Sequence, residues 1–135
     1  MHKLEHIGIA VRNMDEGNAL FARLLGSECY KIETVEAEGV KTSFFRVGEV
    51  KIELLEATRP DSPISKFLEK RGEGIHHLAF EVDNIYTAIE YYRRLGFEPL
   101  TSVPKKGADN KLICFLHPKT TQGVLIELCQ SVTGS

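Results

Sequence analysis

Apolar residues alternate with small or polar ones in two stretches that closely match each other. These are Leu4–Met14 (LEHIGIAVRNM) and Ile75–Ile85 (IHHLAFEVDNI). Alternation with a period of two predicts a β-strand with one buried face. A helix is predicted after each strand, over Asp15–Gly26 and Ile85–Gly96. Both segments end at glycine, which favours a helix end. The repeated pattern indicates an internal duplication.

The ends of the two halves also match. The segment VKIELLE at 50–56 aligns with VLIELCQ at 124–130, and both are typical of a strand. The other strands of the two sets are expected at Thr42–Val47 and Leu112–Leu116, and near Cys29–Val35 and Glu98–Val103. Each half is therefore predicted to contain a strand, a helix and three further strands.

A short helix is predicted between the halves. Ser62 is the expected N-cap, Pro63 the first helical residue, and Gly72 the end. Its apolar face is expected to consist of Ile64, Phe67 and Leu68.

The expected fold is a single α+β domain over residues 1–135, which is long enough to bury a core. Two tandem βαβββ modules, at about 3–57 and 74–130, are expected to form a curved mixed sheet cup with helices on the outside. The linker helix occupies about 62–72.

Two histidines occupy equivalent places in the repeat. Because side chains alternate between the faces of a strand, His6 and Gly8 share the face opposite the apolar residues of their strand. His77 and Ala79 do the same in the second copy. The very small residue beside each histidine leaves this face hollow.

Two glutamates are expected to point to the same side. Glu53 and Glu127 each interrupt an apolar strand, where a carboxylate is costly to bury without a partner. Two imidazoles and two carboxylates suit a divalent ion with open positions. The predicted metal ligands are therefore His6, Glu53, His77 and Glu127. His76 aligns with the opposite face, so His77 is preferred.

Composition excludes several classes of protein. The net charge of -2 gives no bulk attraction for nucleic acid or an anionic membrane, so neither is expected as a partner. There is no long apolar run, and Met1–Leu4 leads directly into a strand pattern, so neither a signal peptide nor a membrane span is expected. Three cysteines without CxxC spacing favour reduced thiols and a cytoplasmic or mitochondrial matrix location.

This organisation resembles the vicinal oxygen chelate superfamily, which includes glyoxalases, bleomycin resistance proteins and dioxygenases. Two segments resemble the methylmalonyl-CoA epimerase family more specifically. They are DSPI at 61–64, and FLHPK at 115–119 followed by GVLIEL at 123–128. The resemblance implies that His6, His77 and Glu127 bind metal, and that Glu53 matches a position filled by Glu or Gln in other members.

The resemblance also implies an isomerase that inverts the α-carbon of methylmalonyl-CoA through a metal-stabilised enolate. Glu127 is expected as one catalytic base. Thr42 stands where some members have an acidic residue, so Glu53, Glu81 or a water is left for the opposite base. The coenzyme A arm is expected near His117 and Lys119. Cobalt(II) is the first expectation for the metal, with manganese, nickel or zinc as alternatives, and a homodimer is expected.

Three other functions fit the fold. A glyoxalase-type isomerase of a glutathione adduct could share the same ligands, but the segments outside the cup favour the epimerase. An extradiol dioxygenase uses two histidines and one carboxylate, so Glu53 argues against it. A metal-free small-molecule binding protein would need no such ligand set.

Overall fold

The computed structural model describes residues 3–132. They form two compact units. The N-terminal unit comprises residues 6–76, and the C-terminal unit comprises residues 77–132 together with residues 3–5. Met1 and His2, which precede the first predicted strand, lie outside the described residues. No helix of the described part is both long and apolar enough to cross a membrane.

The N-terminal unit contains a four-stranded sheet in the order β2-β3-β4-β1. Strands β2, β3 and β4 are antiparallel neighbours, and β1 runs parallel to β4. The elements are β1 (Lys3–Ala10), α1 (Met14–Leu25), β2 (Lys31–Val35), the 3-10 turn η1 (Glu36–Glu38), β3 (Val40–Val47), β4 (Val50–Ala57) and α2 (Pro63–Arg71).

The C-terminal unit repeats this topology in the order β5-β8-β7-β6, with β5 parallel to β8. Its elements are β5 (Gly74–Glu81), α3 (Ile85–Arg94), β6 (Lys105–Gly107), β7 (Lys111–Leu116), the 3-10 turn η2 (Pro118–Thr120) and β8 (Ile126–Ser131). The predicted α+β class and the two βαβββ modules are confirmed.

The two repeat helices start in the same way. The side chains of Asn13 and Asn84 accept hydrogen bonds from backbone amides in the first turn of α1 and α3, which satisfies donors that have no partner within the helix. The first amide of α1 also donates to Glu56, and that of α3 to Gln130, at 2.8 Å in both cases. The last matched residue of each repeat thus holds the start of its helix.

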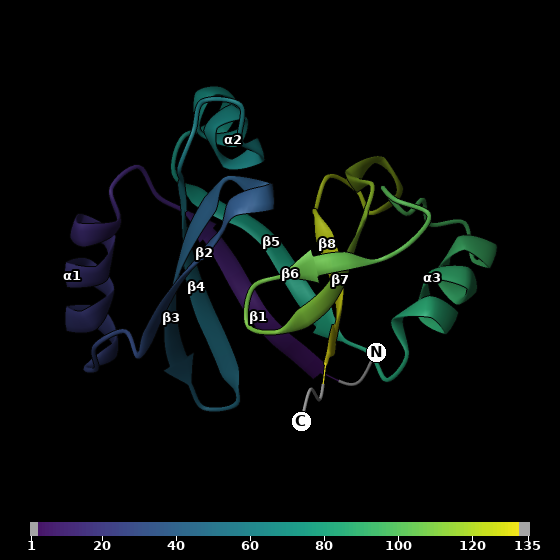
Figure 1. Cartoon of the computed structure of the whole chain (residues 1–135), viewed down its shortest axis with the longest axis horizontal. Helices are drawn as coiled ribbons and strands as arrows, with labels where there is room; N and C mark the ends of the chain where they lie inside the picture. Colours follow the sequence, from purple (N-terminus) through teal and green to yellow (C-terminus); the bar gives the residue numbers. More distant parts are fainter. Residues whose placement is uncertain (1–2, 133–135) are drawn as a thin grey trace. The chain divides into compact units, whose positions relative to one another are not determined.

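Helix α1 lies against the sheet of the N-terminal unit, and α3 lies against the sheet of the C-terminal unit (Figure 1). Helix α1 covers one face of the N-terminal sheet through a core of Val11, Phe45, Leu54 and neighbours, and α3 packs on a core of Val82, Ile85, Ile89, Cys114, Leu116 and Leu128. The linker helix α2 begins at Pro63, as predicted, after the Ser62 cap. It packs through Ile64, Phe67 and Leu68 on a cluster with Ala10 and Leu55.

The first strand begins in the C-terminal unit. Glu5 is buried there, and one of its carboxylate oxygens lies 3.7 Å from the Nζ atom of Lys111 on β7. Lys111 also donates a 2.8 Å hydrogen bond to the hydroxyl of Ser131. Its burial and ion pair fix the ammonium group to the sheet.

One predicted strand is wrong. Glu98–Val103 contains a single isolated bridge, and the edge strand is β6 instead. Pro99 and Pro104 lack the backbone N–H that a strand donates to its neighbour, so they interrupt the predicted ladder. Smaller differences concern strand starts: β2 starts at Lys31 and β8 at Ile126, each two residues later than expected, and β3 starts two residues earlier at Val40.

Candidate functional site

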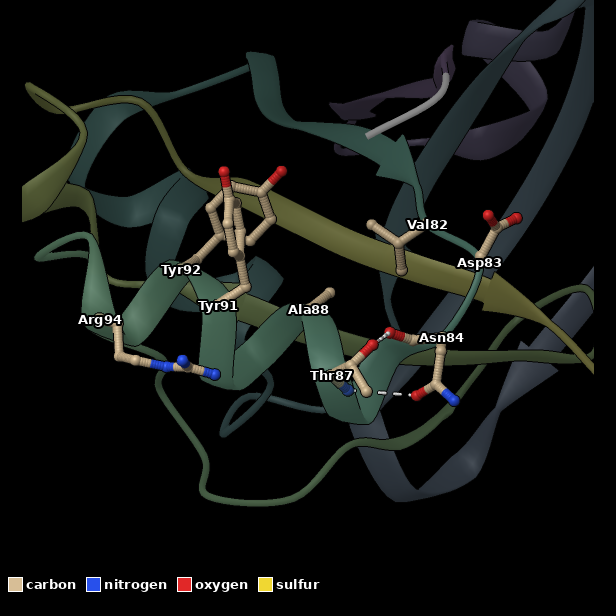
Figure 2. A pocket seen from close by; sticks show the side chains of 8 residues that line it. All are labelled: Val82, Asp83, Asn84, Thr87, Ala88, Tyr91, Tyr92 and Arg94. Atoms are coloured by element: carbon tan, nitrogen blue, oxygen red, sulfur yellow. Dashed lines mark hydrogen bonds between the residues drawn. The ribbon is translucent and has the colours of Figure 1, made fainter.

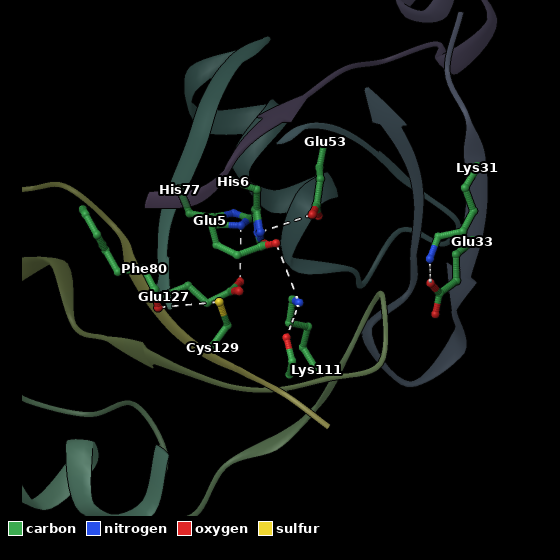
Figure 3. Close-up of polar contacts among 11 residues, drawn as sticks. Glu5, His6, Lys31, Glu33, Glu53, His77, Phe80, Lys111, Glu127 and Cys129 are labelled. Carbon is green, nitrogen blue, oxygen red and sulfur yellow. Dashed lines mark hydrogen bonds and ion pairs between the residues drawn. The ribbon is translucent and has the colours of Figure 1, made fainter. Parts of the chain in front are cut away.

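The N-terminal unit brings His6 and Glu53 together. They come from the parallel neighbours β1 and β4, and Gly8 is the direct register partner of Glu53. The Nδ1 atom of His6 lies 3.2 Å from a carboxylate oxygen of Glu53 (Figure 3). On the other side of Glu53, its antiparallel partner is Phe44, which is fully buried.

The C-terminal unit contains the equivalent pair. His77 on β5 lies with its Nε2 atom 3.3 Å from a carboxylate oxygen of Glu127 on β8 (Figure 3). Ala79 is the register partner of Glu127 on one side, and Phe115 on the other. The Phe115 ring also meets the imidazole of His77 edge-on, with centroids 5.6 Å apart.

Each unit therefore repeats one arrangement: an imidazole beside a carboxylate, with a very small residue and a phenylalanine as the neighbours of the carboxylate. All four polar residues are 4–5 % exposed. Groups of these types are costly to bury, and their pairing offsets part of that cost. Imidazole nitrogen and carboxylate oxygen suit divalent ions such as cobalt, nickel and zinc. Residues of the types that bind metals are thus present in both units, and they fit the predicted cofactor chemically.

His76 is not part of this arrangement. It packs edge-on against Phe67 of α2, with ring centroids 5.0 Å apart, while the neighbouring His77 lies beside Glu127. Burial lowers the pKa of His76 from 6.5 to about 4, because a buried imidazole is costly to charge. His76 is therefore neutral at neutral pH.

This shift predicts an acid sensitivity of the fold. Between pH 6.5 and about 4 the unfolded chain binds a proton at His76 that the folded chain does not. The stability due to neutral His76 is complete above pH 6.5 and is lost as the pH falls towards 4. We expect a loss of about 2–3 kcal/mol in the free energy of unfolding over this interval. Urea unfolding should show a smaller loss in the His76→Gln variant, and equal losses in both proteins would contradict the assignment.

The two residues predicted to contact coenzyme A lie at the turn η2. His117 is the N-cap of this turn, and its Nδ1 atom accepts a 3.1 Å hydrogen bond from the amide of Lys119. The Nζ atom of Lys119 lies 3.0 Å from a carboxylate oxygen of Glu98, and the hydrogen bond from Lys119 lowers the pKa of Glu98. Lys119 is exposed, and its role towards coenzyme A stays a prediction.

Two further features of the site face were missed by sequence reasoning. Phe44 and Phe115 adjoin the two glutamates because of the register between antiparallel strands. Their equivalent places in the repeat were a signal that could have found them. Cys129 shares the face of Glu127. Burial, followed by the charge of Glu127, raises the pKa of its thiol, so Cys129 stays protonated.

A separate hollow lies beside α3, with a volume of about 550 Å³ (Figure 2). It is lined by Val82, Asp83, Asn84, Thr87, Ala88, Tyr91, Tyr92 and Arg94. Neither His77 nor Glu127 lines it, so it is distinct from the imidazole–carboxylate pair of its unit.

Comparison with known proteins identifies the family of the chain. Residues 5–115 match the model of the glyoxalase/bleomycin resistance protein/dioxygenase superfamily. The chain belongs to this superfamily.

Within it, several relatives are named as methylmalonyl-CoA epimerases. The chain is 38% identical over 130 residues to an ethylmalonyl-CoA/methylmalonyl-CoA epimerase of Cereibacter sphaeroides, covering 95% of this chain and 97% of that one. It is 37% identical over 130 residues to the human mitochondrial methylmalonyl-CoA epimerase, covering 96% and 74%. The chain belongs to the methylmalonyl-CoA epimerases, which are isomerases, and the resemblance drawn from the sequence is confirmed.

A solved structure of an epimerase has a similar fold. It is a variant of the Streptomyces coelicolor methylmalonyl-CoA epimerase in complex with 2-nitronate-propionyl-CoA. The two folds superpose with a TM-score of 0.94 at 34% identity, covering 98% of this chain and 96% of that chain.

Proposed function

We propose that the protein interconverts (2R)- and (2S)-methylmalonyl-CoA with the help of one divalent ion held by His6, Glu53, His77 and Glu127. The observation that supports this most is the repetition of a buried imidazole–carboxylate pair in two duplicated units. In this proposal residues 1–135 act together as a single domain.

The residues of the chain divide the work between binding and proton transfer. His6 and His77 would hold the cation through imidazole nitrogens, and the two glutamates would complete the donor set. When bound, the cation would act as a Lewis acid towards the carboxylate and thioester oxygens of the substrate. These two groups are attached to the same carbon. Phe44 and Phe115 flank the carboxylates with apolar surface, which limits the access of water to the reacting carbon.

Inversion needs proton transfer on both faces of a planar α-carbon. We assign Glu127 as the base that removes the α-proton of one configuration, and Glu53 as the group that returns a proton from the other side. In the reverse direction their roles exchange. Thr42, at the position where some family members have an acidic residue, is buried on β3 and has no carboxyl group. The second acid–base group of this chain must therefore lie elsewhere, which supports Glu53.

The finer features of the proposal follow the family. We propose cobalt(II) as the metal, with manganese, nickel or zinc as alternatives that the same nitrogen–oxygen donors accept. His117 and Lys119 are proposed to contact the coenzyme A arm, and the active form is proposed to be a homodimer. The proposed location is the cytoplasm, or the mitochondrial matrix in a eukaryote, since the human relative is named as mitochondrial.

The decisive experiment follows the α-proton. Purified protein, incubated in heavy water with methylmalonyl-CoA of one configuration, should incorporate deuterium at the α-carbon and produce the other configuration, as followed by NMR and chiral analysis. A chelator should stop both processes, and a divalent metal should restore them. A protein that shows no exchange but converts a glutathione hemithioacetal would be a glyoxalase-type isomerase instead. A protein that binds acyl-CoA with neither reaction would be a binding member of the superfamily.

A further inference from the structure

The sheet face that carries His6 and Glu53 also carries a buried lysine. Lys51 is the register partner of His6 on the neighbouring strand, and it lies two residues before Glu53 on β4. Residues at this spacing point to the same face of a strand. Lys51 is only 5 % exposed. The buried Lys51 therefore lies on the same sheet face as the imidazole–carboxylate pair.

The side chain of Lys51 extends to the residue that pairs with Glu53. Its Nζ atom lies 6.0 Å from the ring centroid of Phe44, which is the antiparallel partner of Glu53. A second lysine, Lys31 on the edge strand β2, lies closer to the same ring, at 4.7 Å. Two ammonium groups thus adjoin one phenylalanine, but Lys51 comes from the strand of Glu53, whereas Lys31 lies two strands away from that strand.

The C-terminal unit has a counterpart of Lys31 but none of Lys51. It also has an edge-strand lysine over its phenylalanine, with the Nζ atom of Lys105 5.9 Å from the Phe115 centroid. That contact is common to both units and belongs to the fold. In contrast, Leu125 is the counterpart of Lys51 in the repeat. The duplicated fold accepts an apolar residue at this position, so the scaffold itself does not require the charge of Lys51.

We propose that Lys51 is a specificity-determining residue that binds the free carboxylate of the acyl group. The inference rests on the proposed function and extends it to the choice of substrate. A malonyl-type acyl group carries one negative charge close to the reacting carbon, and a simple acyl thioester carries none. An ammonium group held in a buried face interacts strongly with such a charge, because the surroundings screen it less than water does. A neutral acyl group offers it no such partner, so the site discriminates against simple acyl-CoA.

The test compares two ligands and two lysines. Binding of malonyl-CoA and of propionyl-CoA is measured by titration calorimetry on the full-length, cobalt-loaded protein. The Lys51→Met variant keeps most of the aliphatic stem and removes the charge. It should weaken malonyl-CoA binding by about 10- to 100-fold, as expected for a charged hydrogen bond, and leave propionyl-CoA binding within about twofold. Lys31→Met, which removes the other ammonium group beside Phe44, should leave both affinities within about twofold.

Further variants guard against a purely structural effect. Lys51→Arg retains the charge and should retain most of the preference for malonyl-CoA. Lys51→Gln provides a second neutral side chain if the methionine variant does not fold, as judged by its thermal melting curve. Metal content, measured by atomic absorption, should be unchanged in each folded variant.

The outcomes separate this inference from the proposed function. Equal weakening of both ligands by Lys51→Met, an unchanged preference, or the same effect from Lys31→Met would each overturn the role of Lys51. If the wild-type protein epimerises methylmalonyl-CoA and one of these results is found, only the assignment of Lys51 falls. If the wild-type protein does not epimerise methylmalonyl-CoA, the proposed function itself is wrong.

Discussion

Glu127→Gln is expected to lower kcat for epimerisation by about 10²- to 10⁴-fold, the usual contribution of a positioned general base. Glutamine has almost the same size and still offers an oxygen beside His77, so the fold and much of the metal affinity should survive. It cannot accept the α-proton. The rate is measured with each methylmalonyl-CoA configuration at saturating metal, with Glu90→Gln on the exposed side of α3 as a matched control that should retain full activity.

Isotope exchange sharpens this prediction. If Glu127 and Glu53 serve opposite faces, each glutamine variant should still exchange the α-proton of one configuration with heavy water, because the remaining carboxylate returns a proton to the side from which it took one. The configuration that exchanges should differ between Glu127→Gln and Glu53→Gln. Epimerisation at the wild-type rate by Glu127→Gln would remove it from the mechanism. Exchange of both configurations by Glu53→Gln would assign the second base to another group.

His77→Ala is expected to lower metal affinity by at least about 100-fold, since the loss of a group that merely supports a ligand already costs 10- to 100-fold. The affinity is measured by competition with a coloured chelator. The neighbouring His76→Ala is the matched control, because His76 packs against Phe67 and not beside Glu127. It should keep its metal. The opposite pattern, with the metal lost from His76→Ala and retained by His77→Ala, would show that the ligand assignment is wrong.

Much of the candidate site could be predicted because the direction of a strand side chain depends only on its neighbours along the same strand. The faces of a strand alternate with every residue, so the apolar neighbours of Glu53 and Glu127 determine where these carboxylates point. The duplication then relates the two pairs, and the structure places each histidine beside the glutamate of its own unit. This reasoning needed no knowledge of which strands are neighbours.

The features that depend on strand register could not be predicted in the same way. Phe44 adjoins Glu53, and Lys51 adjoins His6, through pairings between separate strands, and a hydrophobic pattern does not specify these. The segment 98–103 failed for another reason: its residue types suit a strand, but Pro99 is within it and Pro104 follows it directly. Neither can donate to a ladder, and the pairing moves to Lys105–Gly107.

Each unit includes the first residues of a strand whose remainder belongs to the other unit. This affects how the protein can fold during its synthesis. Glu5 is synthesised long before its buried partner Lys111. Residues 74–76, in turn, belong to the N-terminal unit although they open the second repeat. The C-terminal unit therefore closes a very long loop, a step that slows folding. Residues 6–76 can form the N-terminal unit first, whereas stable structure in the C-terminal unit is expected only once both Glu5 and the strand that carries Lys111 have been synthesised.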